Sequence, residues 1–205
     1  MEALVQLSSV VAPLLRDNVD TDAIIPAAYL RSLATDPASG LFAHWRYRPD
    51  GSEDPGFVLN DPRYKGARIL LTGANFGCGS SRENAVWALQ RFGIRCVIAL
   101  GFSDIFYENC FKNGVLPIVL ARDDHERLAR RATGDEPCRV TVDVAARSVL
   151  TEGYAAFPFA LDARKQAMLL SGTDEIAATL AMNERIREFR ARHRARKPWL
   201  YGSEP

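Results

Sequence analysis

Three short, continuously apolar runs occupy the middle of the chain, at 68–73, 96–100 and 115–120. The segments between them, 82–92 and 103–113, carry apolar residues at helical spacing and end in glycine-containing stop signals. Strands that are apolar at every position are typical of parallel sheets with both faces covered. We therefore predict a parallel strand–helix–strand–helix–strand unit with right-handed crossovers.

The segments on either side of this unit are less regular. Two apolar runs near the N-terminus predict strands, and Pro26 predicts the first turn of a helix that runs to about Leu33. After the central unit the pattern predicts a short helix, a β-hairpin and two further helices, the second of them long. These flanking elements are expected at 4–7, 10–15, 123–133, 139–144 with 148–150, 163–170 and 174–194. The expected fold class is α/β, with a flanking β layer and C-terminal helices around the central parallel unit. We expect one domain over 1–205, with a basic helical extension at about 174–205.

Composition narrows the class of protein. The chain has 205 residues, of which 47% are hydrophobic and 25% charged, as in soluble globular proteins. A formal net charge of +1 gives no general case for nucleic acid or a membrane as partner. No apolar run approaches the roughly 20 residues of a membrane helix, and the N-terminus lacks the pattern of a signal peptide. We expect a cytoplasmic protein.

Metal-ligating residues are few. The four cysteines, at 78, 96, 110 and 138, show no CxxC spacing, and the chain has only three histidines. We therefore expect no metal site built from this chain alone. The cysteine count also excludes a disulfide-dense secreted scaffold and favours a reducing compartment.

The strongest candidate for chemistry is the glycine-rich segment 73–84, between a predicted strand and a predicted helix. Its glycines let the backbone approach a ligand, and free N–H groups at a helix N-terminus attract anions. Arg82 can grip a carboxylate with two parallel hydrogen bonds. The segment matches neither a Walker loop nor GxGxxG. It is interpreted as a phosphate- or carboxylate-binding turn, with tight packing as the alternative.

Four details within and around this turn have two interpretations each. Ser80 is either a base, whose alkoxide nearby donors would stabilise, or a helix cap with Ser81. Cys78 is either a reactive thiol or a small residue that a tight turn tolerates. The acidic stretch 17–22 could bind Ca²⁺ but lacks the pattern of an EF-hand, so capping of the nearby helix is the alternative. The arginine-rich tail either binds nucleic acid or a partner, or forms a solvated helical face.

Three long motifs carry a resemblance to a known family. They read Asn-Val-Asp-Thr-Asp-Ala-Ile-Ile-Pro at 18–26, Asn-Phe-Gly-Cys-Gly-Ser-Ser-Arg-Glu at 75–83, and Asp-Ile-Phe-Tyr at 104–107 followed by Phe-Lys-Asn-Gly-Val-Leu-Pro at 111–117. In order and spacing they resemble the small subunit of 3-isopropylmalate dehydratase, in its bacterial form, over about 7–201.

The resemblance implies an aconitase-type swivelling β/β/α domain. It further implies a heterodimer or heterotetramer in which a [4Fe–4S] cluster is held by a large subunit and this chain binds no cofactor. The reaction would interconvert 2-isopropylmalate and 3-isopropylmalate, a dicarboxylate pair, by dehydration and rehydration in leucine biosynthesis. Neither nucleic acid nor a membrane would be a partner.

The resemblance also implies roles for individual residues. Ser80 would be the catalytic base, taking a proton from carbon while the cluster iron, a Lewis acid, draws off the hydroxyl. Gly79, Ser81 and Arg82 would bind the substrate carboxylate.

Two other segments receive roles by the same resemblance. Thr21 and Asp22 would support the active site by holding catalytic groups of the large subunit. Leu30 and Arg31 would lie in a loop that selects the substrate.

Two positions differ from the family pattern as it is usually found. Asn84 stands where the family usually has His, and 33–40 replaces a segment that usually contains Arg, Gly and Phe. Because both lie near the expected substrate region, a paralogous small subunit for another 2-hydroxy diacid, of methylmalate/citraconate or homocitrate type, is the alternative. A second alternative is a non-catalytic, regulatory swivel domain.

Overall fold

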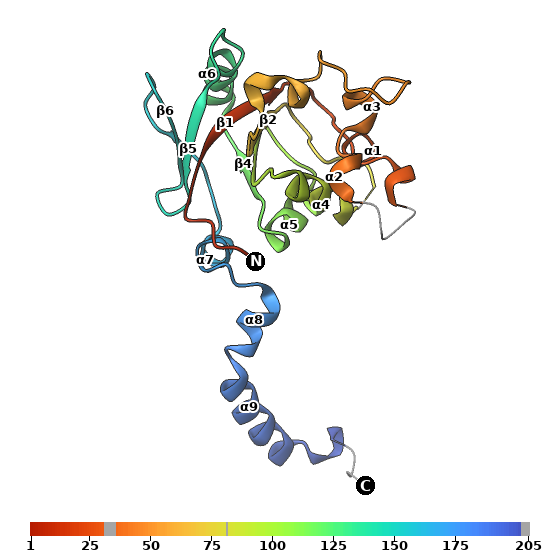
Figure 1. The fold of residues 1–205 in the computed structure, drawn as a ribbon. Helices are drawn as coiled ribbons and strands as arrows, with labels where there is room; N and C mark the ends of the chain where they lie inside the picture. The colour runs from red at the N-terminus through yellow and green to blue at the C-terminus, as the bar shows by residue number, and fades with distance from the viewer. Residues whose placement is uncertain (31–35, 81, 202–205) are drawn as a thin grey trace. The chain divides into compact units, whose positions relative to one another are not determined.

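The computed structural model describes residues 1–30, 36–80 and 82–201. The chain divides into two compact units, Met1–Gly172 and Thr173–Pro205, which we describe separately. Figure 1 traces both along the chain. The first unit contains the sheet and every motif of the sequence that predicted chemistry.

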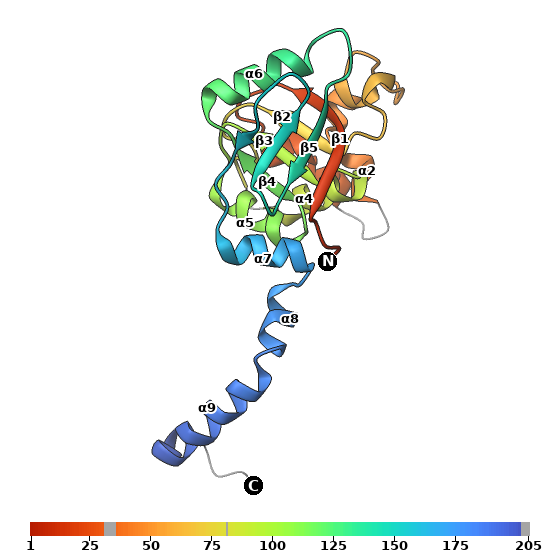
Figure 2. The ribbon, with the colours of Figure 1, turned by 90° about the vertical axis from the view of Figure 1, so that its left-hand side faces the viewer.

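One seven-stranded mixed sheet organises the first unit, in the order β4-β3-β2-β1-β5-β6-β7. The first four strands are mutually parallel, and the last three continue the same sheet in antiparallel pairing through β1. Figure 2 views the sheet after a quarter turn, with β1 and β5 toward the viewer. The strands are β1 (Gln6–Leu14), β2 (Ile69–Thr72), β3 (Cys96–Ala99), β4 (Leu116–Val119), β5 (Arg139–Asp143), β6 (Ser148–Thr151) and β7 (Phe157–Pro158).

The helices of the first unit fall into two groups. Among the described residues, three are single turns that precede β2, and four longer ones follow β2, β3, β4 and β7 along the chain. The single turns are α1 (Thr21–Ile24), α2 (Pro37–Gly40) and α3 (Ala43–Arg46), with 3-10 turns at Ala27–Leu30, Val58–Asn60 and Pro62–Tyr64. The longer helices are α4 (Glu83–Phe92), α5 (Asp104–Lys112), α6 (Arg122–Ala132) and α7 (Ala163–Ser171).

The predicted central unit is confirmed. Strands β2, β3 and β4 lie parallel, with α4 and α5 as the connecting helices. Gly93, at a φ of 110°, ends α4 as predicted, and Ser103 occupies the position before α5. Alternate residues of β2 enter different cores: Leu70 packs with α4 and α5, whereas Ile69 packs with α6 and the antiparallel strands. Burial on both faces is why these strands are apolar except at Thr72, whose buried hydroxyl donates to the Arg16 carbonyl (3.2 Å).

The N-terminal prediction of two strands is wrong, because β1 is one continuous strand over nine residues. Its serines are accommodated by pairing rather than by a turn. Ser9 accepts a hydrogen bond from the Arg68 amide (2.8 Å) and donates to the Val10 carbonyl (2.9 Å). As the only strand paired with both the parallel and the antiparallel part of the described sheet, β1 gains backbone hydrogen bonds along both edges.

The predicted helix from Pro26 to about Leu33 is also different. The chain makes only a 3-10 turn at Ala27–Leu30, and residues 31–35 lie outside the described part of the chain. The helical turn begins before Pro26, because Asp20 caps α1. The backbone becomes extended at Ile25, so α1 does not continue through Pro26.

The second unit contains α8 (Glu175–Leu180), α9 (Asn183–Arg196) and a 3-10 turn at Pro198–Leu200. We predicted one helix over 174–194, and this is wrong in detail. The Met182 amide bonds the Thr179 carbonyl (3.0 Å), an i→i−3 contact that tightens the last turn and ends α8. No helix in the described part of the chain combines the length and apolar character needed to cross a membrane.

Candidate active site

Three loops meet where the parallel strands β1, β2 and β3 end. They follow Leu14, Thr72 and Ala99, the last residues of those strands. The carboxyl ends of neighbouring parallel strands share one edge of a sheet, which is where open α/β sheets bind ligands. This topology brings the acidic segment 17–22 and the glycine-rich segment 73–82 together, although more than fifty residues separate them in the sequence.

The glycine-rich loop is held on both sides by backbone hydrogen bonds. On one side Gly77 donates to the Val19 carbonyl (2.7 Å), and Thr21 donates to the Cys78 carbonyl (2.9 Å). On the other, the Phe76 amide donates to Gly101 (3.0 Å) and its carbonyl accepts from Ser103 (3.1 Å). The loop therefore lies between its neighbours like a short additional strand and is built as a rigid platform.

Two glycines shape this platform. Gly77 and Gly79 have φ angles of 74° and 85°, in the left-handed region that favours glycine. A Cβ at Gly77 would also lie 2.2 Å from Cγ of Phe106, inside its ring contact. Tight packing therefore explains Gly77, whereas a Cβ at Gly79 would meet nothing closer than 3.4 Å. Gly79 is required for its backbone conformation.

The acidic segment serves mainly to fix this geometry. Asp20 caps α1 by accepting from the Ala23 amide (2.7 Å), which confirms the capping interpretation. Asp17 accepts from the Ala74 amide (2.6 Å) and so ties the acidic segment to the glycine-rich loop. Within residues 1–30, 36–80 and 82–201, no group of three Asp, Glu, His or Cys is arranged to hold a metal ion.

Thr21 and Asp22 each contact a residue of the glycine-rich loop. The Thr21 hydroxyl, on a side chain that is 1% exposed, donates to the Ser80 carbonyl (2.9 Å). The Asp22 carboxylate forms an ion pair with the Arg82 guanidinium. The Arg82 side chain is 23% exposed, so the pair is open to solvent on one side. Thr21 and Asp22, which the sequence predicted as supporting residues of the active site, thus contact Ser80 and Arg82 directly.

A hollow of about 230 Å³ opens in front of these residues. Ser80 and Arg82 line it together, so the structure brings a hydroxyl and a guanidinium to one place. The full lining is Thr21, Gly77, Gly79, Ser80, Arg82, Ser103, Asp104, Ile105 and Phe106.

The interpretation of Ser80 as a cap of α4 is wrong, because the N-cap position of that helix belongs to Arg82. Arg82 makes no capping hydrogen bond with its side chain, which instead pairs with Asp22. Ser81, the other predicted cap and carboxylate ligand, lies outside the described residues, as does Arg31 of the predicted substrate loop.

The sequence assigned no role to the residues after β3 that complete the hollow. Ile105 is 54% exposed at its rim, and Phe106 is 3% exposed beneath it. Phe106 belongs to an aromatic cluster with Phe76 and Phe102, at ring-centroid distances of 5.3 and 6.3 Å. These residues directly follow a parallel strand, and the carboxyl ends of parallel strands share one edge of a sheet. Their place in the sequence could therefore have indicated that they lie near the glycine-rich loop.

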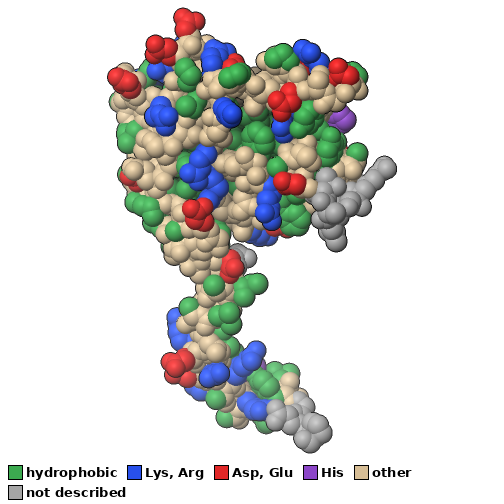
Figure 3. All heavy atoms as spheres, in the orientation of Figure 1, with side chains coloured by type: hydrophobic (Ala, Val, Ile, Leu, Met, Phe, Trp, Pro, Cys, Tyr) green, Lys and Arg blue, Asp and Glu red, His purple; other side chains and the backbone are tan. Residues whose placement is uncertain are grey.

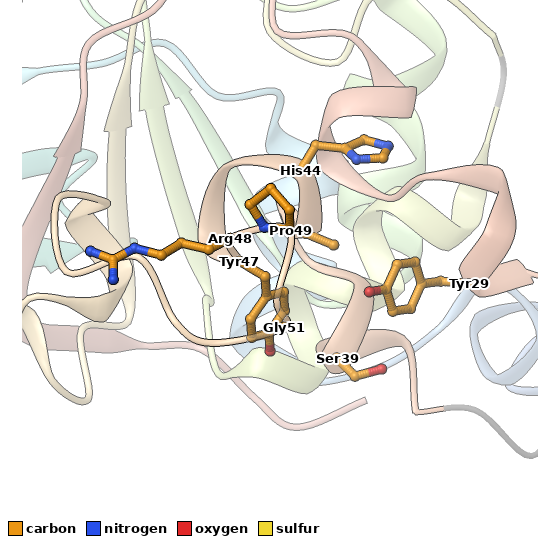
Figure 4. Close-up of a pocket in the computed structure, with 8 residues that line it drawn as sticks. Tyr29, Ser39, His44, Tyr47, Arg48, Pro49 and Gly51 are labelled. Carbon is orange, nitrogen blue, oxygen red and sulfur yellow. The ribbon is translucent and has the colours of Figure 1, made fainter.

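A second hollow, of about 610 Å³, lies beside the start of the predicted substrate loop. Figure 4 shows Tyr29 and Ser39 on one side of it and Arg48 with Pro49 on another. It shares no lining residue with the hollow at Ser80. Leu30 does not line it but packs, half-buried, against the core that includes α4. Leu30 therefore lines neither hollow.

The cysteines differ in accessibility. Cys96, Cys110 and Cys138 are fully buried, and only Cys78, in the glycine-rich loop, is half-buried. Burial raises the pKa of the Cys96 and Cys110 thiols, and for Cys110 the neighbouring Cys96 adds to the effect. Both thiols therefore stay protonated at neutral pH.

Comparison with known proteins shows which families share this architecture. The family model of the aconitase C-terminal domain matches residues 1–123, and that of the C-terminal domain of 3-isopropylmalate dehydratase small subunits matches 175–203. A crystal structure of 3-isopropylmalate dehydratase from Methanocaldococcus jannaschii superposes with a TM-score of 0.64 at 28% identity, covering 90% of this chain and 99% of that one.

The sequence relatives agree. The 3-isopropylmalate dehydratase small subunit of Dechloromonas aromatica is 46% identical over 98% of this chain and all of its own. Those of Rhizobium etli and Neisseria gonorrhoeae are 48% and 43% identical, each over at least 97% of this chain and 99% of theirs.

The mixed, curled sheet with its covering helices defines an α/β domain of the aconitase C-terminal, or swivel, class. Within that class the chain belongs to the family of 3-isopropylmalate dehydratase small subunits. It is part of a hydro-lyase of leucine biosynthesis, and as a small subunit it has a large-subunit partner.

Proposed function

We propose that this chain supplies the proton-transfer and carboxylate-binding side of an active site that is completed by the large subunit. The substrates are 2-isopropylmalate and 3-isopropylmalate, interconverted by dehydration and rehydration. The [4Fe–4S] cluster is assigned to the large subunit, since no described group of Cys, His, Asp or Glu here could hold a metal. The cytoplasm is the proposed location, consistent with four free cysteines.

The observation that carries the proposal is that Ser80 and Arg82 line one hollow at the ends of the parallel strands. Ser80 is exposed there, on a loop whose backbone both neighbouring loops hold. A serine can take a proton from carbon only as its alkoxide, which becomes the hydroxyl in that step and needs nearby donors to stabilise it. The adjacent Arg82 guanidinium offers a positive charge for that purpose. Ser80 is therefore the proposed base, and Thr21 its support.

Arg82 is the proposed ligand of a substrate carboxylate, with Gly79 and Ser81 as further contacts. A guanidinium has five N–H donors. One edge of Arg82 can stay paired with Asp22 while the remaining donors bind the substrate. Asp22 thereby holds the guanidinium in place before substrate arrives, which lowers the entropic cost of binding.

The apolar side of the hollow suits a branched alkyl group. Ile105 exposes more than half of its surface at the rim, next to the ring of Phe106. A substrate with carboxylates toward Arg82 and an isopropyl group toward Ile105 would meet matching chemistry on both sides. Leu30, the last residue of the 3-10 turn at Ala27–Leu30, and the next residue, Arg31, are proposed as further substrate contacts.

The test is conversion of 2-isopropylmalate by the Ser80→Ala chain mixed with the cognate large subunit. Loss of a general base lowers kcat by about 10²- to 10⁴-fold. Ser148→Ala, on β6, is the matched control and should keep full activity. A kcat near that of the unmodified enzyme in Ser80→Ala, with the pair assembled, would remove Ser80 from this role. The chain without its partner should be inactive.

A further inference from the structure

We propose that the second unit, Thr173–Tyr201, is a docking arm that binds an acidic, partly apolar surface of the large subunit. The inference rests on the proposed function, because it needs the large subunit as partner. The residues that line the hollow at Ser80 all belong to the first unit, so a role of the second unit in assembly is distinct from the proposed chemistry.

The arm exposes an unusual number of large apolar side chains. Trp199 is 74% exposed and Ile176 72% exposed, and α9 leaves Phe189 at 57%. Figure 3 shows hydrophobic and basic side chains interspersed along this unit. Exposed apolar side chains grouped in this way mark interaction surfaces, and aromatic residues and Arg dominate binding energy at interfaces. The six exposed large apolar residues of the arm are Ile176, Leu180, Met182, Phe189, Trp199 and Leu200.

One face of α9 combines an apolar seam with arginines. Met182, Ile186 and Phe189 follow each other at spacings of four and three residues, so they lie along one side of the helix. They line a hollow of about 610 Å³ together with Arg185, Arg190 and Arg192, with Glu188 as an acidic neighbour among the three arginines. This combination fits a segment that offers carboxylates beside apolar side chains.

The C-terminal end of the arm is folded back and pre-organised. The Tyr201 hydroxyl hydrogen-bonds Nδ1 of His193 (2.7 Å), and the His193 ring stacks on Phe189 with centroids 5.4 Å apart. Arg194 lies over the Tyr201 ring at 5.5 Å. These contacts close the hollow at one end and present Trp199 outward. A surface that is shaped before binding loses less conformational entropy when a partner docks.

Charge selects the partner. Residues 183–201 contain seven Arg and Lys but only two Glu. A second copy of the chain would bring two such segments together, and like charges disfavour that contact. An acidic surface on a different protein is favoured for the same reason. Residues 175–203 match the model of the C-terminal domain of 3-isopropylmalate dehydratase small subunits, so this segment is a feature of the family.

The experiment measures the affinity of the full-length chain for the cognate large subunit, with kcat recorded at saturating small subunit. Phe189→Ala and Arg190→Glu with Arg192→Glu should each raise Kd at least tenfold and leave kcat at saturation unchanged. Leu150→Ala, an apolar residue of β6 that is 41% exposed, is the control and should leave Kd within twofold. The Kd of the unmodified pair should also rise with ionic strength.

The outcomes are separable. If the unmodified chain binds the large subunit but both arm variants bind equally well, the docking arm is overturned and the proposed function stands. If the unmodified chain does not bind the large subunit, both fail. A third outcome would also overturn the docking arm. In it, the arm variants abolish self-association, or binding to a duplex RNA or DNA probe, and leave the Kd for the large subunit unchanged.

Discussion

Thr21 and Ser80 are joined by a hydrogen bond in which the Thr21 hydroxyl donates to the Ser80 carbonyl over 2.9 Å. The donor side chain is 1% exposed, whereas Ser80 is exposed to the hollow. A buried residue of the loop after β1 thus fixes the backbone of the proposed base on the loop after β2.

This relationship predicts that the Thr21 hydroxyl is needed for turnover. Thr21→Val keeps the shape but removes the donor, so kcat should fall and the free energy of unfolding should drop by about 1 kcal/mol. Thr21→Ser keeps the donor and should retain most of kcat. Steady-state kinetics of the assembled enzyme and thermal unfolding of the chain measure both. Equal kcat in the Val and Ser variants would show that the bond does not matter for catalysis.

Substrate binding by Arg82, which Asp22 positions, should depend on the planar shape of the guanidinium as well as on its charge. Arg82→Lys keeps one positive charge but loses the planar donor set. A hydrogen bond to a charged group contributes about 1.5–3 kcal/mol, so kcat/KM should fall roughly ten- to a hundredfold. Asp22→Asn frees the guanidinium and should raise KM more than it lowers kcat. An unchanged kcat/KM in Arg82→Lys would rule out a bidentate contact.

Ile105 should set preference for the branched substrate. Ile105→Ala removes apolar surface from the rim of the hollow, so KM for isopropylmalate should rise about tenfold. The KM for a 2-hydroxy diacid with a methyl group in place of isopropyl should change little. Leu150→Ala is again the distant control. A parallel rise in both KM values would show that Ile105 acts on folding or assembly rather than on the alkyl group.

The cysteines should react in a defined order. Only Cys78 of the four is half-buried, and the raised pKa of Cys96 and Cys110 keeps these thiols neutral, and therefore unreactive, well above neutral pH. Iodoacetamide at pH 8 should modify Cys78 first, as peptide mass spectrometry would show, while the other three react after unfolding. Early labelling of Cys96 in the folded chain would contradict the buried environment.

The sequence by itself determined the central parallel unit and the glycine-rich loop. Strands buried on both faces must be apolar throughout, and Gly93 must end α4, so both features are readable locally. Capping by Asp20 was also readable, because a side-chain carboxylate needs only the next turn of its own chain. The family followed from motifs that lie in continuous stretches of the chain.

Only the tertiary structure decided which residues meet. The pairs Thr21–Ser80 and Asp22–Arg82 join segments about sixty positions apart, and they exist because β1 and β2 are parallel neighbours whose ends share an edge. The same convergence adds Ile105 from the first turn of α5, the helix that follows β3. Pairing on both edges also makes β1 one strand where the local pattern indicated two. Contacts between distant segments depend on sheet order, and local sequence does not encode that order.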